Sequence, residues 1–489
     1  MSTPKWVKDA IFYQIFPDRF ARSALNPAGN LPFEAWDSAP TTHGFKGGDL
    51  YGVIEKLDYL KDLGITAIYF NPIFSSASNH RYHTYDYYNV DPLLGGNDAF
   101  KKLLKEAHKR DIRIILDGVF NHASRGFWQF NHVLETGSAS PYRGWFHFDE
   151  ERLNGNRRWG AFPTQNEESA LRHEDSLTAI GYRAWWNLPA LPKFNTDNPV
   201  VREYIFDIAE YWLKLGIDGW RLDVPGEIND DEFWREFRRR VRAINPEAYI
   251  VGEIWHEAQR WLQGDQFDAV MNYLVTSTAM NFFGAHHLNR QVLEPAGGLK
   301  DRARPINAHD CANELDHILN LYPEDITYAQ LNLLDSHDMP RFLSCVSGDK
   351  SALQLAWLFM FTIPGAPCIY YGDEIGLDGG HDPECRKSFP WDEGKWDRNL
   401  LEYAKACTSL RTKEASLRRG DYKRLYAEGE VLAYSRTYKD ETLFVAFNAS
   451  NEEKTLELPL GKKPKALFGD PRFSGNNVTI SARSGVVIK

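Results

Sequence analysis

From Ala10 to about residue 375 the sequence alternates short apolar runs with amphipathic helical stretches. Eight of the apolar runs have the length and composition of buried strands. In chain order they are Ile11–Ile15, Ala67–Phe70, Ile112–Phe120, Ile217–Leu222, Tyr249–Val251, Ala269–Met271, Gln330–Leu334 and Cys368–Tyr371. Strands that alternate with helices predict an α/β fold with a parallel sheet, and eight such units favour a closed (β/α)8 TIM barrel over an open sheet.

The segments between these runs have the periodicity of helices that pack on one side. Asp98–Lys109 is typical, because one face of that helix would carry Ala99, Phe100, Leu103, Leu104 and Ala107. Further helices are predicted at Leu50–Leu63, Val201–Leu215 and Asp231–Ala243. Helices with one apolar face are suited to cover the outside of a barrel.

Residues 121–182 interrupt this alternation. They are rich in Trp, Gly, Asn, Arg and Phe and show no clear helical period. A long insertion inside a compact domain is usually functional, and this one leaves the carboxyl end of the third strand, where barrel active sites lie. We therefore predict a catalytic barrel at residues 1–120 and 183–417, with an insertion domain at 121–182.

After about Arg418 the sequence changes character again. Short strand-like runs, separated by turn residues, occur at Leu425–Tyr434, Thr442–Ala446, Lys454–Leu458, Lys465–Leu467 and Val478–Ile480. This pattern predicts an antiparallel β-sandwich at residues 418–489.

Composition excludes several classes of protein. The net charge of −10 argues against nucleic acid as a partner, because phosphate binding needs a basic face. The five cysteines are scattered and form no CxxC pair, so neither a disulfide framework nor a zinc site is expected. The N-terminus has no signal-peptide core, and no stretch approaches the roughly 20 apolar residues of a membrane span. We expect a cytoplasmic protein with no membrane partner.

Four of the predicted strands end in polar residues that a strand does not need. In chain order these residues are Asp117, Asn121 and His122, then Arg221 and Asp223, then Glu253 and Trp255, then Asp335, His337, Asp338 and Arg341. A single Asp at a strand end is usually a cap or a surface residue. Four such ends at one barrel mouth would crowd carboxylates together, which lowers stability unless the crowding serves a function.

Asp223 and Glu253 close neighbouring strands, which lie about 4.8 Å apart in a sheet. That spacing suits the separation of about 5–5.5 Å between the carboxyl groups of a retaining glycosidase. One carboxylate attacks the anomeric carbon, and the other protonates the leaving oxygen and then activates water. Arg221 would keep Asp223 ionised, as a nucleophile must be. The negative charges of Asp338 and Asp223 would raise the pKa of Glu253.

Taken together, these motifs resemble the α-amylase family of glycoside hydrolases (family 13), from the first strand to the C-terminal module. The resemblance implies that Asp223 is the nucleophile, Glu253 the general acid/base, and Asp338 a third acid that grips and helps distort the substrate. It also implies a set of substrate-binding residues, namely Tyr82, Asn121, His122, Arg221, Trp255, His337 and Arg341. Tyr82 would stack on the sugar that is cleaved, with Tyr85 as the second candidate, and Asp117 would be structural.

Two shorter motifs narrow the group. Leu191–Asn195 (LPKFN) is similar to the MPKLN segment of neopullulanases, cyclomaltodextrinases and maltogenic amylases. Typical α-amylases have an Asp in place of Lys193, where it helps hold a structural calcium, and a lysine cannot ligate that cation. Glu227 stands where typical α-amylases carry His. We expect Glu227 on the acceptor side of the site, where it would position a sugar or water; the alternative is a solvated loop carboxylate.

Two features separate the chain from that group. Members commonly carry an N-terminal carbohydrate-binding domain that builds a dimer, whereas here the barrel begins within about the first ten residues, so the oligomeric state stays open. Some members bind calcium after the first strand, but Arg22–Ala28 has no acidic residue, and Asp49 alone is a poor cage for a cation that takes 6–8 oxygens. We expect no tightly bound calcium and no other cofactor.

The resemblance therefore implies a hydrolase that acts on α-glucan oligosaccharides and cyclodextrins. The leading hypothesis is cleavage of α-1,4 bonds in cyclodextrins, maltooligosaccharides and pullulan, with some transfer to sugar acceptors. The alternative is an exo-acting α-glucosidase, or a sucrose or trehalose isomerase, on the same barrel. A third hypothesis is a non-catalytic accessory subunit of an amino-acid transporter. It is disfavoured because such subunits have a membrane anchor and lack catalytic carboxylates, whereas this chain keeps all three.

Overall fold

The structure is a computed structural model that describes residues 3–155, 159–294 and 299–489. Its largest sheet has eight parallel strands: β1 (Phe12–Ile15), β2 (Ala67–Phe70), β5 (Arg113–Gly118), β6 (Gly219–Leu222), β7 (Tyr249–Gly252), β8 (Ala269–Val270), β9 (Leu331–Leu333) and β10 (Ala366–Tyr370). Neighbours follow the order β8-β7-β6-β5-β2-β1-β10-β9. A parallel bridge between Met271 and Leu331 joins the two ends of this order. The predicted parallel barrel is confirmed.

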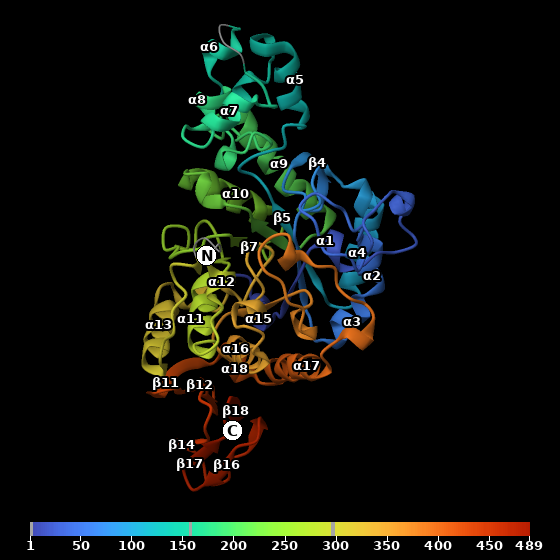
Figure 1. The fold of residues 1–489 in the computed structure, drawn as a ribbon. Coiled ribbons are helices and arrows are strands. Elements are labelled where there is room, and N and C mark those ends of the chain that lie inside the picture. The colour runs from blue at the N-terminus through green and yellow to red at the C-terminus, as the bar shows by residue number, and fades with distance from the viewer. Residues whose placement is uncertain (1–2, 156–158, 295–298) are drawn as a thin grey trace.

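Helices surround this sheet, as Figure 1 shows. The longer ones are α4 (Gly96–His108), α9 (Pro199–Leu215), α10 (Asp231–Ile244), α11 (Tyr273–Phe283), α13 (Ala308–Asn320), α16 (Lys350–Thr362) and α17 (Arg398–Lys413). The shorter ones are α1 (Pro17–Phe20), α12 (Arg290–Leu293), α14 (Glu324–Thr327), α15 (Phe342–Cys345) and α18 (Ala415–Arg419). No helix in the described ranges is long and apolar enough to cross a membrane.

One predicted helix is in fact two. The backbone leaves the helical conformation at Lys56 (φ −107°, ψ 4°), which separates α2 (Leu50–Glu55) from α3 (Leu57–Asp62). The apolar spacing across Leu50–Leu63 is continuous, so the sequence pattern carries no sign of this break.

The residues at the two ends of helix α9 fix where the helix begins and ends, and therefore where the next strand, β6, starts. The Asn198 side chain caps its start by accepting a hydrogen bond from Val200 N–H, and Pro199 occupies the first turn, where its missing N–H is no loss. Gly216 ends the helix with φ 109°, a conformation that glycine adopts without strain. The chain then enters β6, which leads to Arg221 and Asp223.

The insertion after β5 lies at the top of Figure 1, and its described residues form four short helices: α5 (Trp128–Thr136), α6 (Glu150–Leu153), α7 (Gln165–Ala170) and α8 (Ser176–Ile180). Its core is aromatic, with Phe130 packed on Phe146 and Tyr182. Antiparallel bridges pair His122 with Lys193 and Phe146 with Phe194, so the returning chain lies beside the outgoing one. The domain limits at residues 120, 182 and 417 stay predictions.

A short antiparallel pair that the sequence analysis did not identify follows β2. It consists of β3 (Phe74–Ser76) and β4 (Thr84–Val90), and the turn between them carries Tyr82.

The C-terminal region forms two antiparallel sheets, as predicted. The first has the order β11 (Asp421–Glu428), β12 (Val431–Tyr438), β13 (Glu441–Asn448), β18 (Ser484–Ile488) and β15 (Ala466–Phe468); the second has the order β14 (Lys454–Glu457), β17 (Asn477–Ile480) and β16 (Arg472–Ser474). The predicted single strand Leu425–Tyr434 is wrong, because a turn at Gly429 (φ 57°) divides it into a hairpin. Strands β16 and β18 were not predicted.

Candidate active site

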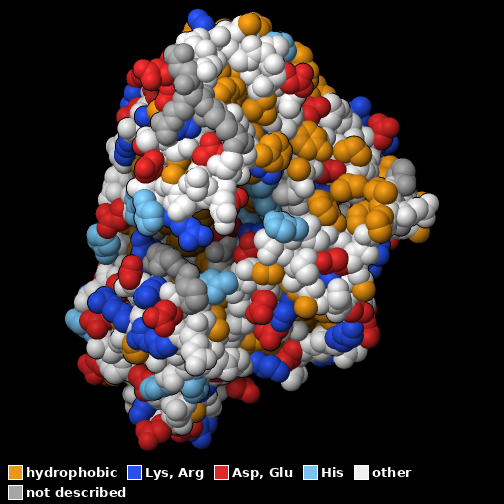
Figure 2. Space-filling view, turned by 45° about the horizontal axis from the view of Figure 1, so that its top comes forward, with side chains coloured by type: hydrophobic (Ala, Val, Ile, Leu, Met, Phe, Trp, Pro, Cys, Tyr) orange, Lys and Arg blue, Asp and Glu red, His pale blue; other side chains and the backbone are white. Residues whose placement is uncertain are grey.

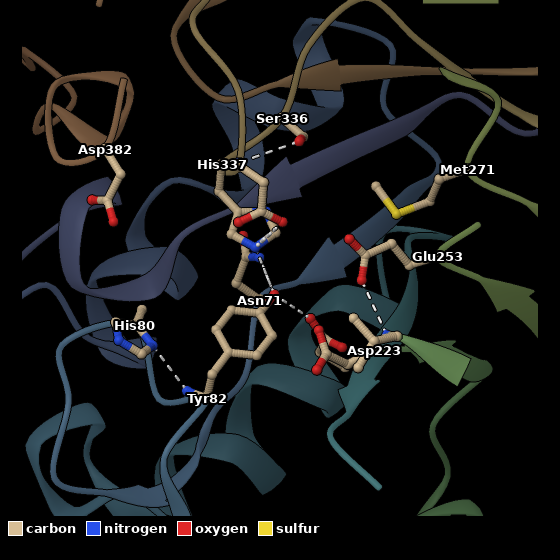
Figure 3. Close-up of polar contacts among 12 residues, drawn as sticks. Asn71, His80, Tyr82, Asp223, Glu253, Met271, Ser336, His337 and Asp382 are labelled. Carbon is tan, nitrogen blue, oxygen red and sulfur yellow. Dashed lines mark hydrogen bonds and ion pairs between the residues drawn. The ribbon is translucent and has the colours of Figure 1, made fainter. Parts of the chain in front are cut away.

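The carboxyl ends of β5, β6 and β7 bring charged side chains to one point. The strand register pairs Asp117 with Arg221 and Leu222 with Gly252. The next residues along, Asp223 and Glu253, therefore sit at the same level on adjacent strands. Figure 3 shows these two carboxylates close together, with Tyr82 nearby. The structure thus brings together the pair that strand spacing predicted.

Arg221 lies at the centre of these carboxylates and is fully buried. Its Nη1 donates to Asp117 Oδ1 and to Asp223 Oδ1, each at 2.9 Å. Its Nη2 forms an ion pair with Glu253 Oε2 at 2.9 Å. From sequence, Arg221 is expected to act on Asp223 alone, whereas in the structure one guanidinium neutralises part of the charge on three carboxylates. We call Arg221, Asp117, Asp223 and Glu253 the Arg221 cluster.

Glu253 receives two further hydrogen bonds. The Trp255 indole N–H donates to Oε1 at 3.0 Å, and Val224 N–H donates to Oε2 at 3.1 Å. Val224 follows Asp223 directly and has a left-handed backbone (φ 36°, ψ 49°), which is a strained conformation for a β-branched residue. Backbone strain at a residue between two carboxylates is the kind that functional sites retain.

Burial shapes the protonation of the cluster. It raises the pKa of Glu253, with Arg221 opposing and Asp338 adding to the rise. It also raises the pKa of Asp223 well above its usual value, although Arg221 opposes this. From sequence, repulsion between carboxylates is expected to raise the pKa of Glu253, and Arg221 is expected to keep the pKa of Asp223 low. Burial is the larger influence on the pKa of both groups.

Asp338 lies at the open side of the cluster, where 32% of its side chain is exposed. It contacts His337 Nε2 at 3.0 Å and accepts a hydrogen bond from Arg386 at 3.3 Å. Burial raises the pKa of Asp338, while Arg386 and Arg221 lower it. Arg386 was not predicted, because it belongs to a loop after β10 rather than to a strand end.

His337 and Tyr82 are fixed by a hydrogen-bond network. The Gln14 amide Nε2 lies 3.0 Å from His337 Nδ1, and because an amide N–H donates, Nδ1 accepts and the ring proton sits on Nε2. That Nε2–H lies 2.7 Å from the Tyr82 hydroxyl, which itself donates to Asp117 Oδ2 at 2.8 Å. Burial lowers the pKa of His337 well below its usual value, so the ring is a neutral donor. Asn71 also donates to Tyr82, at 3.1 Å.

Asn121 and His122 lie at the start of the insertion, and both are buried. Within the described part of the chain, Asn121 Oδ1 and His122 Nε2 have no hydrogen-bond partner. Burial lowers the pKa of His122 to about 3, so the ring is neutral. The Asn121 amide lies 3.2 Å from His122 Nδ1, which as the acceptor leaves the proton on Nε2. This pair therefore offers one acceptor and one donor to a bound hydroxyl group.

The remaining predicted residues have different surroundings. Trp255 stacks on Tyr273 with ring centroids 3.7 Å apart, next to Glu253. Glu227 is 54% exposed and lies 3.5 Å from Lys193 Nζ, in the loop that follows β6. Arg341 is not brought to the Arg221 cluster.

Instead, Arg341 is buried beside the last strand. It donates to Asp373 at 2.7 Å, to Tyr371 O at 2.9 Å and to Cys385 O at 3.1 Å. Its Nη1 and Nε are thus bonded within the protein, which points to a structural role, and its Nη2 has no hydrogen-bond partner among the described residues.

The loop after the first strand provides no free carboxylate at Asp49. Asp49 uses its oxygens in hydrogen bonds from Ser23 N–H and Gly52 N–H, the second of which caps α2. Across the described residues, no group of three or more His, Cys, Asp or Glu side chains has the arrangement of a metal site.

Figure 2 shows the surface hollowed below the insertion, with histidine side chains at the edge of the hollow. Asp223 and Glu253 are each 7% exposed, so most of each residue is shielded from solvent.

Comparison with known proteins agrees with this geometry. Residues 14–416 match the family model of the α-amylase catalytic domain, and residues 422–481 match that of the maltogenic amylase C-terminal domain. The chain therefore belongs to the α-amylase family of glycoside hydrolases.

Its relatives narrow this assignment. A cyclomaltodextrinase from Geobacillus thermopakistaniensis is 44% identical over 95% of this chain and 73% of its own length. Neopullulanase 2 from Thermoactinomyces vulgaris is 42% identical over 94% of this chain and 72% of its own. The structure of a debranching enzyme from Nostoc punctiforme, soaked with acarbose, has a TM-score of 0.86 and 44% identity, with 100% of this chain and 99% of that one covered. The chain is an α-glucan hydrolase of the cyclomaltodextrinase, neopullulanase and maltogenic amylase type.

Proposed function

We propose that the protein cleaves α-1,4-glucosidic bonds in cyclodextrins, maltooligosaccharides and pullulan with retention of configuration, and that it transfers part of the sugar to sugar acceptors. The observation that carries this proposal is the Arg221 cluster, in which Asp223 and Glu253 occupy the same level of adjacent strands and share one guanidinium. Adjacent strands give the short carboxyl separation that retention requires. The cytoplasmic location stays a prediction.

In the first step Asp223 attacks the anomeric carbon. Arg221 holds Oδ1, and Oδ2 receives no hydrogen bond from the described residues, so the attack falls to Oδ2. A bond forms between Oδ2 and the anomeric carbon while the glycosidic bond breaks. The proposed chemistry needs an ionised Asp223 and a proton on Glu253. The hydrogen bond from Arg221 Nη1 to Asp223 Oδ1 favours the ionised form of Asp223 and opposes the effect of burial on its pKa.

Glu253 gives that proton to the leaving oxygen. Its Oε2 already receives Val224 N–H and faces Arg221, whereas Oε1 receives only the Trp255 indole, so Oε1 carries the proton. In the second step the Glu253 carboxylate takes a proton from water or from an acceptor hydroxyl. That oxygen bonds to the anomeric carbon, and the bond to Asp223 breaks. Hydrolysis and transfer therefore use the same machinery.

Asp338, His337, Tyr82 and the Asn121–His122 pair hold the sugar between these carboxylates. Asp338 accepts from sugar hydroxyls, and the neutral His337, whose Nε2–H donates to the Tyr82 hydroxyl, keeps the Tyr82 ring in place. Arg386 and Gln14 act as positioning residues, because each contacts a residue of this set rather than the reacting atoms. We do not include Arg341 among the proposed substrate-binding residues.

Product analysis with β-cyclodextrin, pullulan and soluble starch tests the substrate assignment. We expect maltose as the main small product and panose from pullulan, which reports cleavage of α-1,4 bonds. Glucose alone from every substrate would favour the exo-acting α-glucosidase instead. An isomer of sucrose or trehalose as the product would favour the isomerase.

A second candidate activity is cleavage of α-1,6 bonds. The observation that favours it is the 44% identity to an enzyme named as debranching, over the whole of this chain. Pullulan separates the two activities, because α-1,6 cleavage releases maltotriose whereas α-1,4 cleavage releases panose. Both products together would mean that one active site accepts both linkages.

A further inference from the structure

An aromatic ladder leads from the active site to the surface of the insertion. The His122 ring stacks on Trp185 with centroids 5.0 Å apart and an interplanar angle of 15°. Trp185 stacks in turn on Trp186, at 5.1 Å and 20°. His122 is fully buried, whereas Trp186 is 81% exposed, the largest value among the exposed large hydrophobic residues that the structure describes. The ladder thus begins beside the candidate site and ends in solvent.

The outer ring sits on a backbone that does not favour it. Trp186 has φ 55° and ψ 27°, and Asn187 has φ 57°, both in the left-handed region. A bulky aromatic residue is uncommon there, and its side chain gains little from burial when most of it faces water. Strain combined with exposure of a large apolar ring gives no benefit to folding, and features of this kind persist where they serve a function.

Several hydrogen bonds fix the turn that carries the Trp186 ring. The Asn187 amide donates to Leu171 O at 3.2 Å and to Glu174 O at 3.0 Å, and its carbonyl accepts from Ser176 N–H at 3.0 Å. Trp185 N–H donates to Leu191 O at 2.9 Å. The indole of Trp186 is therefore presented by a fixed turn, which lowers the entropic cost of binding a ligand against it.

The position of the ladder indicates what it binds. His122 pairs through an antiparallel bridge with Lys193, whose ammonium donates to Glu227 O at 2.8 Å. The ladder therefore lies beside the loop of Glu227, which we place on the acceptor side. A glucosyl ring has no net charge and has one face of C–H groups, so a flat, uncharged indole at the edge of the site matches it.

We propose that the outer face of Trp186 is a binding platform for a glucosyl unit of an α-glucan chain, beyond the bond that is cleaved and on the side of Glu227. This inference rests on the proposed function, because it assumes that the chain acts on α-glucans. It adds a named contact that would make the enzyme prefer longer chains.

The test compares kcat/KM for maltoheptaose with kcat/KM for maltotriose. In W186A the ratio of the two should fall about tenfold, which corresponds to the loss of one ring contact. W186Y, which keeps a flat ring, should recover most of the ratio. W128A is the matched control, because Trp128 belongs to the same insertion and is 59% exposed but stacks on neither His122 nor Trp185. The ratio should not change in W128A.

A third variant separates binding from folding. Glycine adopts positive φ without strain, so W186G should melt at the same temperature as the wild type or a higher one, while its ratio falls as in W186A. A lower Tm in W186G would show that the ring supports the fold, and an unchanged ratio in W186A would overturn the proposal. If the wild type turned over neither oligosaccharide, the proposed function itself would fail, and that outcome is seen before any variant is made.

Discussion

Arg221 and Arg341 are both fully buried, and each forms ion pairs with carboxylates near the carboxyl ends of barrel strands. Around Arg341, the Asp373 side chain is 5% exposed, and Asp335 accepts from Phe342 N–H at the start of α15. The guanidinium also lies 4.3 Å from the centroid of the Tyr370 ring. All of these contacts are with other parts of the protein, so this second group is buried in the interior.

The Arg221 cluster differs in its balance of charge and in its access. One guanidinium faces Asp117, Asp223 and Glu253, and Asp338 lies next to them with a third of its side chain exposed. Carboxylates therefore outnumber the cation, and the site opens to the surface. Removing one partner from a closed, buried ion pair is strongly destabilising, whereas an open group with three or more carboxylates around one cation keeps a reactive arrangement at the expense of stability.

The largest expected difference between the Arg221 cluster and the group around Arg341 is the effect of substitutions on kcat. D223N and E253Q should each lower kcat by roughly 10³ or more, because each removes a group that takes part in bond making or proton transfer. Steady-state assays on β-cyclodextrin check this, with circular dichroism to confirm folding. Near-full activity of either variant on every α-glucan tried would contradict the assignment.

Stability should respond in the opposite way around Arg341. D373A leaves a buried guanidinium without its carboxylate, so the free energy of unfolding should fall by about 3–5 kcal/mol. Urea denaturation at pH 7 measures this. Below its melting temperature D373A should retain kcat within tenfold of the wild type; a loss as large as that of D223N would place Asp373 in the catalytic machinery.

Acid sensitivity tests the buried state of His122. Its pKa is about 3 in the folded protein and about 6.5 in an unfolded chain, so between these values only the unfolded state binds the proton. His122 therefore makes the protein less stable as the pH falls below 6.5, by about 1.4 kcal/mol per pH unit. H122N should remove this contribution, about 2.7 kcal/mol at pH 4.5.

Urea denaturation between pH 7 and pH 4.5 supplies the measurement for His122. H309N, at an exposed position on α13, is the matched control and should keep the wild-type dependence on pH. Equal slopes for H122N and the wild type would mean that the His122 ring becomes charged in the folded state.

The smallest effect expected is a gain in stability in the Arg221 cluster. Burial raises the pKa of Asp223, so its charge opposes folding at pH 7, and D223N should raise the free energy of unfolding by about 1 kcal/mol. Thermal unfolding of D223N beside the wild type checks the sign. A decrease would show that the cluster is held together by this charge, as the Arg341 group is.

The barrel and the meeting of Asp223 with Glu253 could be predicted from sequence for one physical reason. Parallel strands of a barrel end at one mouth, so Asp117, Asp223 and Glu253 converge although they are far apart in the chain. The same rule led us to expect Arg341 at the substrate site, but its side chain points elsewhere. A strand end fixes where a residue lies but not where its side chain points. Gln14 and Asn71 obey the rule but were overlooked.

Other parts of the site had no local signal. Arg386 reaches Asp338 from a loop whose path depends on tertiary packing, and the strained conformation of Val224 depends on its neighbours rather than on its residue type. The missed turn at Gly429 has a plainer cause, since a continuous apolar pattern across a tight hairpin resembles one long strand.

In the proposed mechanism Asp223 forms a covalent bond with the sugar while Glu253 moves the proton. E253Q treated with α-maltosyl fluoride tests it most directly, because fluoride leaves without an acid and the missing base slows the second step. Peptide mass spectrometry should then find a maltosyl group on Asp223, and proton NMR of the wild-type reaction should show the α-anomer first. A sugar attached to another residue, or the β-anomer as the first product, would contradict the account.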